Sequence, residues 1–173
     1  MDERSQSPSE KGQARLPVVL RPCTRADLPV LYEIDRSCYA PEVAYSRGTL
    51  KAFLEQEGVR CLMAFVEGRP AGFVMAFWQG EEGHLITLDV LARYRRKGIG
   101  STLLLAIEEQ MRRAGVSWVE LETSVANATA IAFWTHHGYR ITGTLPGYYS
   151  DRTDAYLMAK RLDRGTGNRR KAG

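Results

Sequence analysis

The chain has 173 residues, 44% of them hydrophobic, and a formal net charge of +4. That size fits one domain with its own core, and no apolar run reaches the roughly 20 residues that a membrane-spanning helix needs. The polar N-terminus lacks the apolar stretch of a secretory signal, so we expect a cytoplasmic protein with no membrane partner.

The two ends of the chain differ from its body in composition. We expect residues 1–15 to be a disordered N-terminal tail, residues 16–162 a single folded domain, and residues 163–173 a flexible basic tail. The basic residues of the last segment lie among Gly and Asn, which is more typical of a solvated tail than of an arm that binds nucleic acid. The pattern does not distinguish a monomer from a homodimer.

The three cysteines indicate free thiols. Cys23, Cys38 and Cys61 are odd in number and lack metal-ligand or redox spacing. We therefore expect small buried residues and no metal site.

The first half of the body predicts a strand, two helices and three more strands. Thr24 and Asp27 form the capping-box pattern that opens a helix, which we expect to run to Cys38. Ser46 is the expected cap of the second helix. The expected strands are 18–21, 60–66, 71–78 and 84–90, with a hairpin turn at 67–70.

The second half alternates helices and strands. Apolar residues at helical spacing predict a helix over 98–114, closed by Gly115, and a second over 127–137, ended by Gly138. The expected strands are 116–123, 139–144 and 155–160. The order predicts an α+β fold: a mixed, mostly antiparallel sheet of six to seven strands with about four flanking helices. Its central parallel pair is 84–90 with 116–123.

A basic, glycine-containing turn follows the strand 84–90 and leads into a helix. The first N–H groups of a helix lack intrahelical partners, and its dipole favours an anion there. Gly98 and Gly100 let the backbone approach such a group closely. The spacing fits neither the Walker pattern nor the Rossmann fingerprint, which needs Gly where residue 103 is Leu. We expect the pyrophosphate of a small molecule to bind here.

Two motifs then resemble one family. Arg95-x-x-Gly98-x-Gly100 resembles the Arg/Gln-x-x-Gly-x-Gly/Ala motif of GNAT-type acetyltransferases. The run from Glu122 through Asn127 and Trp134 to Tyr139 is similar to a stretch of the RimI/Ard1 branch, which acetylates protein N-termini. The resemblance covers residues 17–162 and implies transfer of acetyl from acetyl-CoA to an amine, with a protein N-terminus as the leading acceptor.

The resemblance also implies a cofactor site. The strand end 88–90 would bind the pantetheine and polarise the thioester carbonyl through backbone amides, and the basic turn would hold the pyrophosphate. Strands splaying after 88–90 and 121–123 would form the slot for the pantetheine. The implied acetyl-CoA-binding residues are Leu88, Asp89, Val90, Arg95, Arg96, Lys97, Gly98, Ile99, Gly100, Ser101, Asn127 and Trp134.

Glu122 is the candidate general base, because it lies at a strand end and falls on the position of the base in the RimI branch. Glu120, on the same strand face, is the second candidate. Trp134 departs from the branch, which carries a Tyr there as a proposed acid, since an indole does not release a proton near neutral pH. Water, Tyr148 or Tyr149 could protonate the thiolate instead, or no acid is needed.

Other residues are candidates for acceptor binding. Tyr39, Glu42 and Tyr45 lie in the connection between the first two helices, which walls the acceptor site in this family. Tyr148 and Tyr149 follow the turn after residue 145, and Asp89 is a further candidate for contact with a cationic amine. His136 and His137, in contrast, suit the dipole at a helix end.

Two other functions stay open at this point. One is acetylation of lysine side chains or a small-molecule amine. The other is a non-catalytic acyl-CoA-binding module, which the missing Tyr at position 134 favours and the presence of Glu122 and Asn127 opposes.

Overall fold

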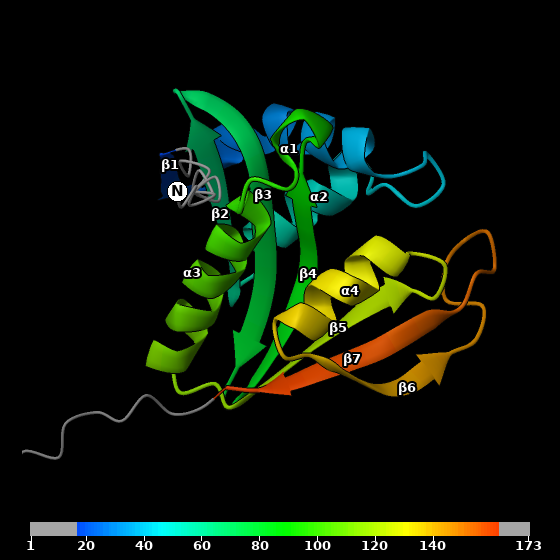
Figure 1. The fold of residues 1–173 in the computed structure, drawn as a ribbon. Helices are drawn as coiled ribbons and strands as arrows, with labels where there is room; N and C mark the ends of the chain where they lie inside the picture. Colours follow the sequence, from blue (N-terminus) through cyan, green and yellow to red (C-terminus); the bar gives the residue numbers. More distant parts are fainter. Residues whose placement is uncertain (1–16, 163–173) are drawn as a thin grey trace, which may run out of the picture.

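The computed structural model describes residues 17–162, which form a seven-stranded sheet in the order β1-β2-β3-β4-β5-β7-β6 (Figure 1). The strands are β1 (Val18–Pro22), β2 (Val59–Val66), β3 (Arg69–Gln79), β4 (Glu82–Val90), β5 (Trp118–Ser124), β6 (Arg140–Leu145) and β7 (Ala155–Arg161). β4 and β5 pair in parallel and all other neighbours are antiparallel, which confirms the predicted fold class. Residues 1–16 and 163–173 lie outside the described residues, so both expected tails and residue 16 of the expected domain do as well.

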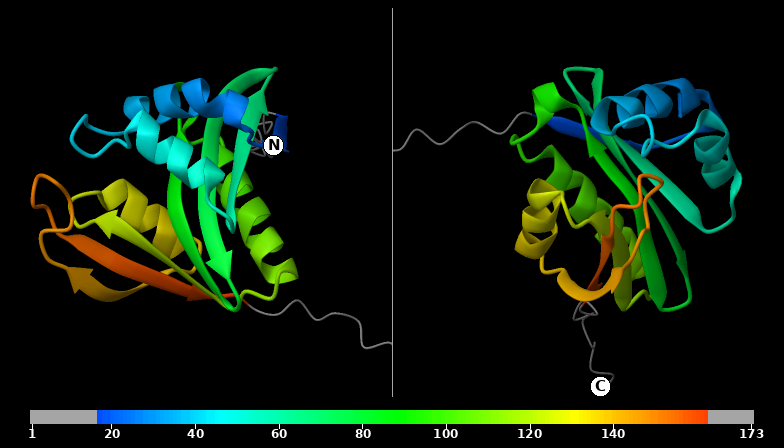
Figure 2. Two further views of the ribbon diagram at one scale, coloured as in Figure 1. Left: turned by 180° about the vertical axis from the view of Figure 1, so that it is seen from behind. Right: turned by 90° about the vertical axis from the view of Figure 1, so that its right-hand side faces the viewer.

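Helices cover both faces of the sheet. They are α1 (Leu28–Cys38), α2 (Arg47–Glu55), α3 (Ile99–Arg113) and α4 (Ala128–His136), with short 3-10 turns η1 (Arg25–Asp27) and η2 (Ala92–Tyr94). α3 and α4 lie on the face toward the viewer in Figure 1, and the view from behind in Figure 2 shows α1 and α2 on the other face. Each helix in residues 17–162 is too short or too polar to span a membrane.

The alternation of side chains along β2 explains this layering. Leu62 and Ala64 belong to the core under α3, whereas Cys61 and Met63 belong to the core under α1 and α2. Because successive residues of a strand point to opposite faces, a strand that is apolar at every position needs cover on both sides. The apolar run of β2 therefore requires the helical layers that the sheet has.

The structure shifts several predicted boundaries. The hairpin turn is Glu67–Gly68, with φ of 50° and 73°, and Arg69 and Pro70 already belong to β3. Positive φ at both central residues suits a two-residue turn between twisted strands. Gly98 is the N-cap of α3 rather than part of it, and the Thr24 capping box begins the short turn η1 that precedes α1.

The parallel pair is short, and this creates the split in the sheet. β4 and β5 pair at Glu82–Trp118, Gly83–Val119 and His84–Glu120. A register shift in the β3–β4 ladder between Met75 and Ala76 lies next to the end of this pairing. The strands thus separate after His84 and Glu120, earlier than the predicted separation after 88–90 and 121–123. Their diverging ends are visible in Figure 1.

Candidate active site

A cavity of about 760 Å³ lies where β4 and β5 separate, and we call it the wedge cavity. Its walls come from both diverging strands, from the first turns of α3, and from α4. Of the residues predicted to bind cofactor or acceptor or to act as base, it is lined by Leu88, Asp89, Val90, Arg95, Arg96, Gly98, Ile99, Gly100, Ser101, Asn127, Trp134, Glu122, Tyr39 and Tyr149. Lys97, Glu42, Tyr45 and Tyr148 are outside this lining; the Lys97 ammonium instead lies 5.8 Å from the centre of the Tyr94 ring.

The turn before α3 has an unusual backbone. Arg96 and Gly98 have φ of 61° and 82°, and no side chain of the described residues caps the N-terminus of α3. Alternation into the left-handed region turns successive N–H groups toward one point, and uncapped helix amides add to them. Arg95 is held beside the turn because its Nε donates to the Val90 carbonyl over 2.8 Å. This end of the wedge cavity is therefore rich in donors and positive charge.

The opposite wall is built by α4. Asn127 caps this helix, since its Oδ1 accepts from the Ala130 amide over 3.0 Å. The helix is tied to α3 by Ser101 Oγ and His137 Nε2, which are 2.9 Å apart. Burial lowers the pKa of His137. His137 therefore lies at the end of α4 as expected and also links α4 to α3.

Trp134 is part of this wall rather than a free polar group. It is 8% exposed, and its ring centre lies 5.0 Å from that of Phe133 and 5.5 Å from that of Tyr139 in edge contacts. Such contacts indicate packing.

Glu122 lies on β5 at the mouth of the wedge cavity and has a partner that the sequence analysis missed. Its Oε2 accepts from His84 Nε2 over 2.7 Å, and the two side chains are 19% and 41% exposed. A donor at this distance from a carboxylate makes a charge-assisted hydrogen bond, which fixes the orientation of the carboxylate. The signal in the sequence was that the strands containing His84 and Glu122 were predicted to be neighbours.

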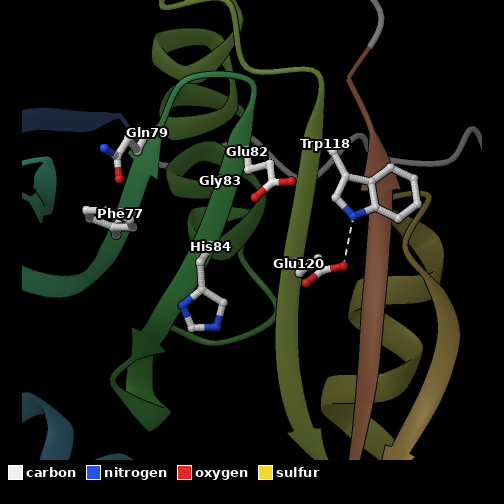
Figure 3. A pocket seen from close by; sticks show the side chains of 7 residues that line it. All are labelled: Phe77, Gln79, Glu82, Gly83, His84, Trp118 and Glu120. Carbon is white, nitrogen blue, oxygen red and sulfur yellow. Dashed lines mark hydrogen bonds between the residues drawn. The ribbon is translucent and has the colours of Figure 1, made fainter.

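His84 also lines a second hollow of about 530 Å³, the side recess, shown in Figure 3. The recess is bounded by side chains of β3, β4 and β5. Here Glu120 accepts from the Trp118 indole N–H over 2.8 Å, drawn as the dashed line in Figure 3. Glu120 therefore lies in the side recess, whereas Glu122 lies in the wedge cavity.

Two loops, 39–46 and 146–154, approach each other beside Glu122. They are joined because Ser150 Oγ donates to the Glu42 carbonyl oxygen. The Tyr148 hydroxyl faces the Glu122 carboxylate, and burial together with that carboxylate raises the pKa of Tyr148. Burial raises the pKa of Tyr149 to about 12. Both phenols therefore keep their protons at neutral pH, and Tyr149 lines the wedge cavity whereas Tyr148 does not.

Asp89 lines the wedge cavity mainly through its backbone, because the residue is 1% exposed. Its Oδ1 accepts from the Thr87 hydroxyl over 2.8 Å, and its carboxyl group faces Asp35 of α1. The Asp89 side chain is thus buried beneath the loop 39–46 and is not, as the sequence had suggested, exposed to bind an amine.

Comparisons with known proteins agree with this geometry. Residues 28–139 match the acetyltransferase (GNAT) family. An uncharacterised N-acetyltransferase of Methanocaldococcus jannaschii is 30% identical over 83% of this chain and 92% of its own length. An N-alpha-acetyltransferase of Saccharolobus solfataricus is 33% identical over 63% of this chain and 73% of its own. The crystal structure of the ribosomal-protein-S18-alanine N-acetyltransferase from Escherichia coli matches with a TM-score of 0.78 and 26% identity, over 84% of this chain and 94% of that one.

Proposed function

Since the chain belongs to the acetyltransferase (GNAT) family, whose members use acetyl-CoA, we propose that it acetylates the N-terminal α-amino group of a protein or peptide. Membership confirms the resemblance drawn from the turn 95–100 and the run 122–139. The observation that carries the choice of acceptor is that relatives over most of the chain are named for N-terminal acetylation.

The wedge cavity fits acetyl-CoA. The donors at the start of α3, with Arg95 and Arg96 beside them, would hold the diphosphate, as helix N-termini do in many phosphate sites. The diverging strands leave an edge of β4 over 85–90 without a strand partner, so its backbone groups are available to the amides of a pantetheine arm. Asn127 uses its Oδ1 as a helix cap, which leaves its amide NH₂ group to donate to that arm.

Amine acetylation needs an activated acetyl group and a group that takes the proton of the amine. Acetyl-CoA supplies the first, as a thioester. Glu122 would take the proton, because its carboxylate lies at the mouth of the cavity and is oriented by His84. Because the Glu122 side chain is 19% exposed, its carboxyl group would then pass the proton to water.

The chain needs no Tyr at position 134 for this reaction. Trp134 packs as part of the wall, and Tyr148 lies outside the lining of the wedge cavity. Water at the cavity mouth is then the source of the proton for the departing thiolate, a tolerable leaving group. Location in the cytoplasm stays a prediction, and a monomer and a homodimer are equally compatible with the proposal.

A peptide panel tests the proposal by release of the CoA thiol from acetyl-CoA. Each peptide is offered in matched forms, with a free or a blocked N-terminus, and each contains one lysine. We expect release with the free forms alone. Equal release with blocked forms would reassign the acceptor to lysine, and preference for a free polyamine would reassign it to small amines. Tight CoA binding without release from any amine would indicate a non-catalytic module.

A further inference from the structure

Two buried carboxyl groups lie side by side under the loop 39–46. Asp35 of α1 is 0% exposed, and its Oδ2 accepts from the Tyr45 amide over 2.7 Å. Asp89 of β4 is 1% exposed, and its Oδ1 accepts from the Thr87 hydroxyl over 2.8 Å. Neither residue has a cationic partner among the ion pairs of the described residues.

The remaining oxygen of each group shows how the pair is satisfied. Asp35 Oδ1 and Asp89 Oδ2 are buried and have no donor among the described residues, and each carboxyl group is close enough to shift the pKa of the other. Two carboxylates cannot donate to one another, and leaving two buried acceptors without a donor is costly. A single proton between the groups supplies the donor and removes one of the two charges.

We propose that Asp35 and Asp89 share one proton, and that this carboxyl pair is a clamp that positions the acceptor loop 39–46 against β4. The inference rests on the proposed function only in calling the loop part of the acceptor site. Asp35 and Asp89 are positioning residues, because they act on the acceptor through the loop.

The contacts of the loop connect the pair to the site. The Tyr45 amide is held by Asp35, and the Tyr45 hydroxyl donates to the Ile86 carbonyl of β4 over 3.4 Å. Tyr39 and Thr87 place their hydroxyl oxygens 3.4 Å apart, and Thr87 in turn donates to Asp89. Both ends of the loop therefore reach β4 through groups that contact the pair, on the strand beside the wedge cavity.

The clamp depends on pH. Burial raises the pKa of Asp35 to about 6 and that of Asp89 to about 7, the second also because of the neighbouring Asp35 charge. The other titratable or charged groups around the pair are Cys38, Tyr39, Tyr45, Cys61 and Arg95. Burial raises the pKa of Cys38, Tyr39 and Tyr45, and the hydrogen bond with Cys23 followed by burial raises that of Cys61, so these groups stay neutral while the pair titrates. Loss of the shared proton above about pH 7 leaves two buried charges facing each other, and the clamp opens.

Asparagine variants separate the shared proton from simple packing. In Asp89→Asn the side-chain NH₂ donates to Asp35 at every pH, and the pair never carries more than the one negative charge of Asp35. Asp35→Asn does the same in the reverse direction and is used if the first variant folds poorly. Glu33→Gln is the matched control, since Glu33 is an exposed acid on the same helix.

The first readout needs no substrate: the hydrogen-exchange protection factor of the Tyr45 amide, corrected for the intrinsic exchange rate, at pH 6.5 and 8.5. We expect protection in the wild type and Glu33→Gln to fall about tenfold at the higher pH, as expected for a lost buried hydrogen bond. Asp89→Asn should keep its protection at both values. The same fall in folded Asp89→Asn, or no fall in the wild type, would overturn the clamp.

The second readout is the KM for a peptide with a free N-terminus. At each pH the KM of the wild type is divided by the KM of Asp89→Asn, because titration of the peptide amine affects both proteins equally and cancels in this ratio. This ratio should rise about tenfold between pH 6.5 and 8.5, while the corresponding ratio for acetyl-CoA stays constant. A constant peptide ratio in active proteins would overturn the positioning role. Exchange that switches in a protein without turnover would support the clamp and sink the proposed function instead.

Discussion

Replacing Glu122 with Gln removes the proposed base and keeps the shape of the site. The amide fills the same volume, and its oxygen can still accept from His84, so the wedge cavity should retain both substrates. General bases contribute about 10²–10⁴ in rate. Because Glu122 is 19% exposed, water can partly replace it, which places the expected loss of kcat at about 10²–10³, or about 3–4 kcal/mol.

The assay is CoA release under saturating acetyl-CoA and peptide, with KM measured for each substrate. Both KM values should stay within about threefold of the wild type, because ground-state binding is unchanged. Glu120→Gln is the matched control on the same strand face, and it should retain its rate since Glu120 is engaged by Trp118 in the side recess. A wild-type rate in Glu122→Gln would refute the assignment, and loss in Glu120→Gln would move the role there.

A double-mutant cycle with His84 extends this test. His84→Ala should lower kcat about tenfold, the size of one charge-assisted hydrogen bond at a partly exposed site. If His84 acts by orienting Glu122, the same substitution should have little further effect in Glu122→Gln. Independent, multiplying losses would show that the imidazole acts apart from the carboxylate.

Three further outcomes test the cofactor site and the core. Gly100→Ala would place a Cβ 3.3 Å from the Phe133 ring, so we expect CoA affinity, measured by calorimetry, to fall about tenfold with little change in kcat. Unchanged affinity would argue against close backbone approach there. Glu108→Gln removes the buried charge that binds Lys160 at 2.8 Å and should lower the free energy of unfolding in urea by about 3–5 kcal/mol. A loss below about 1 kcal/mol would mean that Lys160 reaches water. Asp27→Asn should cost about 1 kcal/mol at pH 7 through loss of the charge that pairs with Arg21 at 2.7 Å. The Arg21 guanidinium holds the pKa of Asp27 below its ordinary value, so this stability is present above about pH 4 and the gap to the wild type should close as pH falls further; a constant gap would contradict the role of the charge.

Helix caps and helix ends could be predicted because each depends on a few residues that are adjacent in the sequence. Ser46 does accept from the Thr49 amide at the start of α2, and Gly115 follows the end of α3 as expected. The hairpin boundary was wrong because Pro70 can occupy a strand: it pairs with Phe65 at a register shift, where a missing N–H is tolerated. Boundaries thus depended on pairing details that composition does not encode.

The site could be predicted only in part, for a related reason. The turn before α3 and Glu122 lie in contiguous motifs, so their place on the cavity followed from the sequence. His84 and Glu122 form a hydrogen bond although they are 38 positions apart in the sequence. Asp35 of α1 likewise lies near Asp89 of β4, a different secondary-structure element. Such partnerships depend on strand register and helix packing. The early end of the β4–β5 ladder, which sets the shape of the cavity, likewise follows from tertiary pairing.

The short ladder between β4 and β5 divides the sheet into two parts. β1–β4 and β5–β7 are each continuous antiparallel ladders, whereas three residue pairs connect them. Side chains rather than backbone pairing therefore hold much of this junction together: Glu108 of α3 binds Lys160 of β7, and Ser101 of α3 binds His137 at the end of α4. One core cluster also contains residues of both halves, among them Leu62 of β2 and Leu121 of β5, so the packing of α3 across the split sets the width of the wedge cavity.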